Sequence, residues 1–157
     1  MPARGFEGAI FDVDGVLVDS PHERAWQDSL RELMENDWAD IAEETSWSDA
    51  RFTPQVYQHV LSGKPRMSGA LAALEYFEVP DAAERVQTYA ANKQAMVIKL
   101  IEAGEFEAYP DALRFVLAVR DAGIPLAAAS SSKNAGLLLR QIRLDLFAAE
   151  RGLHYGF

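Results

Sequence analysis

The stretch Ile10-Phe11-Asp12-Val13-Asp14-Gly15-Val16-Leu17-Val18-Asp19-Ser20 places carboxylates directly after a short apolar run. We predict a strand over residues 9–13 that presents Asp12 and Asp14 at its carboxyl end, before a sharp turn at Gly15. Two carboxylates this close repel each other unless a divalent cation neutralises them, and oxygen ligands beside a phosphate suit Mg²⁺. The pattern therefore favours metal-assisted phosphoryl transfer over its alternative, an ordinary Asp-Gly turn.

Composition narrows the function classes. The chain has 157 residues, no cysteine and a formal net charge of −9. This charge argues against nucleic acid and anionic membranes as general partners. The lack of cysteine excludes a disulfide framework and a thiolate metal site. The N-terminal residues resemble neither a signal peptide nor a membrane anchor, so we expect a soluble, cytoplasmic protein.

The hydrophobic pattern changes twice along the chain. Helical spacing fills residues 21–105, with expected helices from Pro21 to Met34, from 53 to 61, from 68 to 77 and from 82 to 103. An α/β pattern then predicts a helix over 112–122, a buried strand over 124–129 and a helix to about residue 144. We expect an α/β core with a parallel sheet, formed by residues 1–20 and 106–157, and an all-helical cap of residues 21–105.

The string D-x-D-G-V-x-x-D-S, from Asp12 to Ser20, resembles the first motif of the haloacid dehalogenase-like (HAD) superfamily. The resemblance implies a HAD-like Rossmannoid sheet with a helical cap, as in the β-phosphoglucomutase-like group. It also implies that Asp12 is a nucleophile that becomes an aspartyl phosphate and that Asp14 is the general acid and base. Both residues would hold Mg²⁺, Asp14 through its backbone carbonyl. A calcium loop built from Asp12, Asp14 and Asp19 lacks the further spaced ligands.

A second polar run follows the other predicted strand. Residues 126–134, LAAASSSKN, resemble the family's second motif. The resemblance implies that Ser130 binds a phosphoryl oxygen, with Ser131 and Lys133 completing a phosphate-binding loop. The alternative is a helix cap formed by Ser132 or Asn134.

Four residues of the predicted cap are candidates for contact with a substrate. Lys64 and Arg66 form a basic loop in an acidic protein, and both could face one phosphorylated ligand; a solvated turn is the alternative. The spacing His22-x-x-x-Trp26 and the later Lys93 resemble cap residues of phosphomutases. For Lys93, the alternative is a solvated lysine on a helix surface.

The superfamily pattern also contains a later lysine and a later acidic pair, which have no counterpart in these 157 residues. Our hypothesis is a HAD-like hydrolase that acts on a small phosphorylated metabolite, as a phosphatase or a phosphomutase. The alternative is a truncated, inactive relative that binds phosphate weakly or serves as an interaction module. A sheet of two strands also leaves an apolar edge, through which two copies of the chain could associate.

Overall fold

A computed structural model of the chain describes residue 5 and residues 7–150. Its contacts divide the chain into two compact units. The α/β unit comprises residues 1–20 and 101–157, and the helical unit comprises residues 21–100. Residues 151–157, the end of the predicted core, lie outside the described residues. In the described part of the chain, no helix is both long and apolar enough to cross a membrane.

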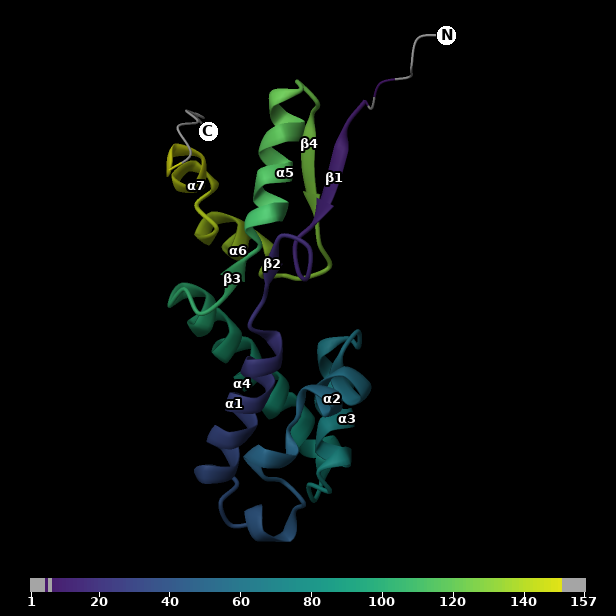
Figure 1. Cartoon of the computed structure of the whole chain (residues 1–157). Helices are drawn as coiled ribbons and strands as arrows, with labels where there is room; N and C mark the ends of the chain where they lie inside the picture. The colour runs from purple at the N-terminus through teal and green to yellow at the C-terminus, as the bar shows by residue number, and fades with distance from the viewer. Residues whose placement is uncertain (1–4, 6, 151–157) are drawn as a thin grey trace. The chain divides into compact units, whose positions relative to one another are not determined.

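The α/β unit contains the parallel sheet that the sequence predicts. Its strands are β1 (Ala9–Asp12) and β4 (Leu126–Ala129), which pair in parallel (Figure 1). Helix α5 (Pro110–Asp121) packs against one face, where the rings of Phe11 and Phe115 meet edge to face with centroids 6.0 Å apart. Because the strands are parallel, the residues that follow β1 and β4 lie together at the carboxyl end of the sheet.

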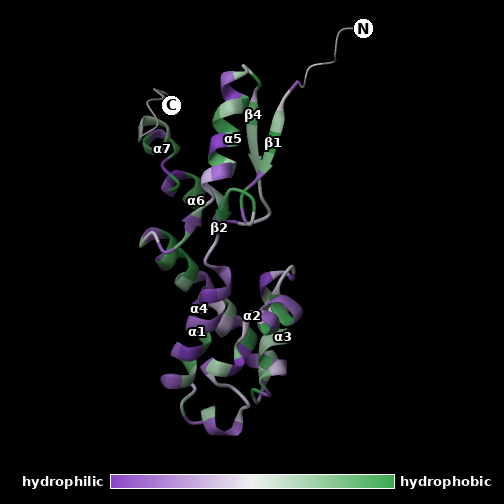
Figure 2. Ribbon diagram, viewed as in Figure 1, coloured by the Kyte–Doolittle hydropathy of each residue, from purple (hydrophilic) through white to green (hydrophobic). Residues whose placement is uncertain are grey.

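The prediction that the second strand is buried is wrong. All four residues of β4 are exposed, and the side chain of Ile10 on β1 is 74% exposed. Figure 2 shows apolar colour along both strands. Parallel strands become buried only when layers cover both faces of the sheet, and among the described residues α5 covers one.

Two features of the α/β unit differ from the predicted elements. Strands β2 (Val18–Asp19) and β3 (Glu107–Ala108) form an antiparallel pair of two residues each, which is too short to leave a hydrophobic pattern. The last predicted helix, expected to end at about residue 144, corresponds to α6 (Ala135–Gln141), and a short break separates it from a further helix that was not predicted, α7 (Leu144–Glu150). The break occurs because Arg143 has a φ of 52°, which no residue inside a right-handed helix adopts.

The helical unit is built on three long helices, α1 (His22–Glu35), α3 (Arg66–Tyr76) and α4 (Ala82–Glu102), the last of which runs on into residues 101 and 102. Four short elements lie between α1 and α3: the 3₁₀ turns η1 (Ala42–Glu44) and η2 (Asp49–Arg51), helix α2 (Pro54–Val56) and the π-helical turn η3 (Tyr57–Leu61). The arrangement agrees with the predicted order of helices, although α3 begins two residues earlier than expected.

Aromatic side chains form much of the core of the helical unit. Trp26 and Trp38 are buried, and Trp47 packs partly buried against the same cluster. The rings of Phe52 and Phe77 stack with centroids 5.9 Å apart, and Trp47 meets Phe77 edge to face at 5.1 Å. The three tryptophans therefore pack in the core of this unit.

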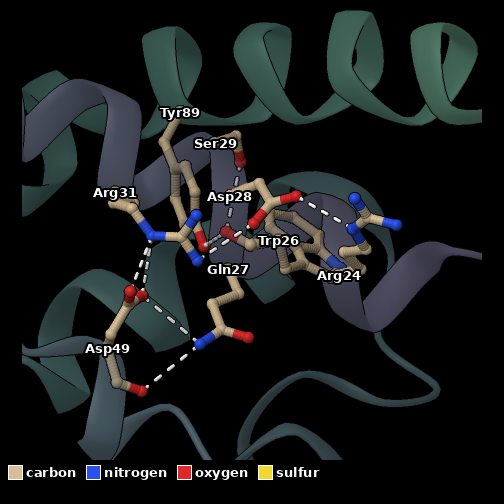
Figure 3. A network of polar contacts seen from close by, with 8 residues as sticks. All are labelled: Arg24, Trp26, Gln27, Asp28, Ser29, Arg31, Asp49 and Tyr89. Atoms are coloured by element: carbon tan, nitrogen blue, oxygen red, sulfur yellow. Dashed lines mark hydrogen bonds and ion pairs between the residues drawn. The ribbon is translucent and has the colours of Figure 1, made fainter.

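A network of polar contacts fastens η2 to α1 (Figure 3). The Nε of Arg31 donates to both carboxylate oxygens of Asp49, at 2.9 and 2.8 Å, and Gln27 donates to Asp49 Oδ1 and to its backbone carbonyl, each at 3.3 Å. The hydrogen bond to Asp49 raises the pKa of the Arg31 guanidinium, and the negative charge of Asp28, whose Oδ1 forms an ion pair with Arg31 Nη2 at 3.0 Å, raises it further. These contacts hold η2 against the part of α1 that contains Gln27 and Arg31.

Candidate active site

A tight turn after β1 presents the carboxylates. Val13 is fully buried, and its carbonyl oxygen accepts hydrogen bonds from the amides of Leu17 at 2.9 Å and Val18 at 3.1 Å. Gly15 has a φ of 77°, a left-handed conformation that costs a side-chain-bearing residue about 1–2 kcal/mol. The buried valine therefore anchors a turn that carries one carboxylate on each side of it.

The structure brings Asp12, Asp14 and Ser130 together. Asp12 pairs in register with Ala129, so Ser130 follows β4 beside the turn that follows β1. Ser130 Oγ donates to Asp14 Oδ2 at 3.2 Å. Asp12 Oδ1 accepts from the amide of Val13 at 2.7 Å. Asp12 is exposed and Asp14 is half-buried, so the site is open to a solute on the Asp12 side.

The loop after β4 is organised by its own serines. Ser130 Oγ accepts from the amide of Ser132 at 3.0 Å, and Ser132 Oγ accepts from the amide of Asn134 at 3.2 Å. The hydroxyl of Ser132 thus makes a hydrogen bond within the loop and not a helix cap, since the N-cap residue of α6 is Asn134 and its side chain makes no cap hydrogen bond. Ser131 and Lys133 are exposed on the same loop, where they add a hydroxyl and a positive charge beside the carboxylates.

The oxygen atoms of Asp12 and Asp14 are ligands of the kind that a magnesium ion prefers, but they are few. Among residues 5 and 7–150, no three Asp, Glu or His side chains gather closely enough to hold a metal ion. Asp12 and Asp14 supply carboxylate oxygens at one edge of the sheet. Mg²⁺ is commonly held by one or two carboxylates, with waters and substrate phosphate oxygens completing its octahedron. The two carboxylates fit this mode of binding.

A second cluster lies inside the helical unit and joins α1 to α4. Lys93 Nζ lies 3.2 Å from His22 Nδ1 and 5.0 Å from the centroid of the Trp26 ring. Lys93 is only 6% exposed, so the alternative of a solvated surface lysine is wrong. A helix that is apolar on one face buries the lysine because its ammonium finds an aromatic face and an imidazole there.

Sequence reasoning missed the residue that holds this cluster. Tyr89, one helical turn before Lys93, is fully buried, and its hydroxyl donates to the carbonyl oxygen of Trp26 at 2.9 Å (Figure 3). Its ring meets the Trp26 ring edge to face at 5.1 Å. Burial raises the pKa of Tyr89 well above its ordinary value. The i, i+4 spacing of Tyr89 and Lys93 was the available signal, but it did not reveal which residue of α1 they contact.

The structure does not bring Lys64 and Arg66 to a common ligand position. Lys64 Nζ donates to the carbonyl oxygen of Val60 on the preceding π-helical turn, and Arg66 is the half-buried first residue of α3. Three residues later, a Cβ added to Gly69 would lie 3.4 Å from the Trp26 ring. Helix α3 therefore passes close to the Trp26 ring at Gly69.

Comparisons with known proteins give a consistent result. The sequence model described as haloacid dehalogenase-like hydrolase matches residues 6–151. A beta-phosphoglucomutase of Mycobacterium tuberculosis (strain CDC 1551 / Oshkosh) is 32% identical over 154 residues, which cover 90% of this chain and 57% of that protein. A haloacid dehalogenase-like hydrolase domain-containing protein of Arabidopsis thaliana is 26% identical over 151 residues, covering 88% of this chain and 48% of its own.

Solved structures resemble the chain over the same extent. An archaeal beta-phosphoglucomutase from Pyrococcus sp. strain ST 04 superposes with a TM-score of 0.65 at 30% identity, covering 87% of this chain and 57% of its own. CbbY from Rhodobacter sphaeroides, solved in complex with phosphate, gives a TM-score of 0.60 at 21% identity and shows the shared fold. The chain thus spans 48% to 57% of the length of these four proteins.

Proposed function

Because the chain belongs to the haloacid dehalogenase-like hydrolase family, we propose that it transfers a phosphoryl group from a small phosphorylated metabolite to Asp12. One observation carries the proposal. The parallel pairing of β1 with β4 delivers Asp12, Asp14 and Ser130 to one edge of the sheet, and Ser130 Oγ donates to Asp14 Oδ2 at 3.2 Å. A nucleophile, an acid and base, and a hydroxyl donor for the phosphate are thereby assembled in one place.

The reaction would proceed in two halves. The amide of Val13 engages Asp12 Oδ1, so we assign Oδ2 as the attacking oxygen. Asp12 Oδ2 forms a bond to phosphorus while the bond between phosphorus and the oxygen of the leaving alcohol breaks. Asp14 donates a proton to this leaving oxygen. A water molecule then attacks the aspartyl phosphate, Asp14 takes its proton, and inorganic phosphate leaves with the Asp12 carboxylate restored.

Asp12 and Asp14 would hold Mg²⁺, which supplies several kcal/mol of charge stabilisation at the phosphoryl oxygens. Ser130 would turn its hydroxyl from Asp14 to a phosphoryl oxygen. Ser131 and Lys133, on the same exposed loop, would add a further hydroxyl and a positive charge to this phosphate-binding loop. The excess of acidic residues gives the chain a charge of −9, so local cations of this kind have to attract the anionic substrate.

We assign substrate choice to the helical unit and expect a sugar phosphate. The support is the pair of His22 and Lys93, an imidazole and an ammonium group that are held beside the Trp26 ring. The matched relatives named beta-phosphoglucomutase point to the same substrate class. We propose hydrolysis as the reaction, with phosphomutase activity as its variant, and a cytoplasmic location because a cysteine-free chain needs no oxidising compartment.

The test is phosphate release from a panel of sugar phosphates in the presence of Mg²⁺. Turnover that is lost in Asp12→Asn and kept in Asp37→Asn, an exposed aspartate of the helical unit, is the expected result. Equal turnover in the wild type and Asp12→Asn would rule out the aspartyl-phosphate route. Conversion of β-glucose 1-phosphate to glucose 6-phosphate, measured in parallel, separates the mutase from the phosphatase.

A non-enzymatic role is the second candidate, and one observation favours it. The described residues supply two acidic ligands at the site and no group of three, in a chain that spans 57% of the matched relative's length. Such a chain would bind phosphate through Ser130 without turning a substrate over. Phosphate binding that Ser130→Ala weakens, with no turnover on any substrate of the panel, is the result that would establish this role.

A further inference from the structure

Asp14 is followed directly by Gly15, and an Asp-Gly peptide bond is chemically labile in a flexible chain. Every other glycine of the sequence follows a residue other than aspartate or asparagine. Glycine has no Cβ, so its backbone nitrogen can approach the carboxyl carbon of the preceding aspartate closely. Attack of the nitrogen on that carbon gives a cyclic imide. Asp14-Gly15 is therefore the position of this sequence that is most open to the reaction.

The reaction rearranges the backbone in two steps, and water is its only co-reactant. In the first step, the Gly15 nitrogen forms a bond to Asp14 Cγ, and the hydroxyl of the carboxylic acid form leaves as water with the amide proton. In the second step, water adds to the former backbone carbonyl of Asp14, and the bond between this carbonyl and the Gly15 nitrogen breaks. The chain then runs through Cγ as an isoaspartate linkage, and the former backbone carbonyl has become the side-chain carboxylate.

The folded turn holds both reacting groups in place. The amide of Gly15 donates to the carbonyl oxygen of Val18 at 2.7 Å, and Val18 is fully buried. On the other side, Asp14 Oδ2 accepts from Ser130 Oγ at 3.2 Å. Attack on Cγ requires the bond between Gly15 and Val18 to open, because the Gly15 nitrogen has to lose its proton and turn toward the side chain of Asp14.

We propose that Asp14-Gly15 is a site of isoaspartate formation that the hydrogen bond from Gly15 to Val18 protects, so that the modification proceeds only through opened states of the turn. The population of the open form then sets the rate in the folded chain. Unfolding exposes the chain to an irreversible chemical change at one defined bond. The proposal concerns a peptide bond and is independent of whether the chain turns a phosphoester over.

A pair of like charges beside the turn favours its opening. Strand β2 contains Val18, the acceptor of the protecting bond, and it pairs with β3 through only two residue pairs. One of these pairs sets Asp19 directly opposite Glu107, and both side chains are exposed. Like charges directly opposite each other destabilise a strand pair. The turn therefore opens by local separation of β2 from β3, short of global unfolding.

The test compares the native chain with the same chain in concentrated urea, both kept in water labelled with heavy oxygen. Proteolysis and mass spectrometry with electron-transfer fragmentation identify isoaspartate, and the heavy oxygen that the second step introduces, in the peptide that contains Asp14. We expect isoaspartate at Asp14 in urea and a rate that is at least about tenfold lower in the native chain. Equal rates in the two states, or no isoaspartate at Asp14 in urea, would overturn the proposal.

Two variants test whether the opening of the turn sets the rate. Glu107→Lys places opposite charges across β2 and β3, and Glu102→Lys makes the same change at the exposed last residue of α4. In the native chain, we expect Glu107→Lys to slow both hydrogen exchange at the Gly15 amide and isoaspartate formation by at least about twofold. Glu102→Lys should change neither rate. Unchanged amide exchange in Glu107→Lys, or slower exchange with unchanged isoaspartate formation, would contradict the proposal.

Discussion

Ser130 Oγ donates a hydrogen bond to Asp14 Oδ2 at 3.2 Å, which joins the ends of two strands that lie far apart in the sequence. The contact exists because β1 and β4 pair in register and because Gly15 turns the chain directly after β1. It fixes the half-buried carboxylate that we assign as acid and base. The Ser130 hydroxyl that forms this contact is also the group that we propose to bind a phosphoryl oxygen of the substrate.

Removing this hydroxyl should slow the reaction without unfolding the chain. We expect Ser130→Ala to lower kcat for phosphate release by about ten- to a hundredfold, the loss of one hydrogen bond to a charged group. Ser48→Ala, which removes an exposed hydroxyl from the helical unit, is the control and should lose less than about threefold. Equal losses in the two variants would remove Ser130 from its assigned role.

The turn that presents the carboxylates depends on a left-handed glycine. Gly15→Ala should destabilise the chain by about 1–2 kcal/mol, because alanine is strained at a φ of 77°. Urea unfolding measures the change. Gly5→Ala, at a described position where an added Cβ meets no atom within 4 Å, is the control and should leave the unfolding midpoint unchanged.

The buried lysine of the helical unit should contribute to binding and not to stability. Lys93→Met keeps much of the side-chain volume but removes the ammonium between His22 and Trp26. We expect a raised KM for the sugar phosphate and an unfolding midpoint that is unchanged or higher, because a buried charge costs desolvation free energy. Lys99→Met changes an exposed lysine on the same helix and should alter neither quantity. An unchanged KM in Lys93→Met would contradict the assignment.

The fully buried phenol of Tyr89 should make the stability of the chain depend on alkaline pH. Burial raises its pKa in the folded state, whereas an unfolded tyrosine ionises near pH 10. Its contribution is therefore complete below about pH 10 and is lost as the pH rises above that value, since the unfolded state then releases a proton that the folded state keeps. Urea unfolding of the wild type at pH 8 and at about pH 11 measures this slope.

Tyr89→Phe separates the hydrogen bond from the ring. The variant keeps the edge-to-face contact with Trp26 and loses the bond to the Trp26 carbonyl, which Ser29 Oγ also contacts at 3.2 Å. We expect a loss of about 1 kcal/mol at pH 8 and a smaller difference between the two pH values than in the wild type. An identical pH dependence in both proteins would show that another group is responsible.

The sequence predicted what local chemistry determines. The Asp-x-Asp-Gly string and the serines after the second strand predicted which residues meet at the sheet edge, because parallel strands end at a common edge. The helical spacing of α1 predicted its buried face, which includes Trp26 and Leu30. Each of these patterns spans only a few neighbouring residues, so each can be recognised within a single strand, loop or helix.

Contacts between distant segments could not be predicted in the same way. The burial of Lys93 depends on the α1 side chains that α4 meets, and the bond of Tyr89 to Trp26 spans 63 residues. The exposure of β4 depends on a layer of structure that the described residues do not contain, so an apolar strand pattern predicted burial wrongly. Arg143 breaks the last helix through a positive φ that its residue type does not signal.

The central claim is that Asp12 accepts the phosphoryl group. The most direct measurement is intact-protein mass spectrometry, followed by peptide mapping, after the chain is incubated with Mg²⁺ and a small phosphoryl donor such as acetyl phosphate and quenched in acid. The account predicts a mass increase of one phosphoryl group that maps to the peptide containing Asp12 and is absent in Asp12→Asn. An adduct that persists in Asp12→Asn, or phosphate release without any adduct on this peptide, would contradict it.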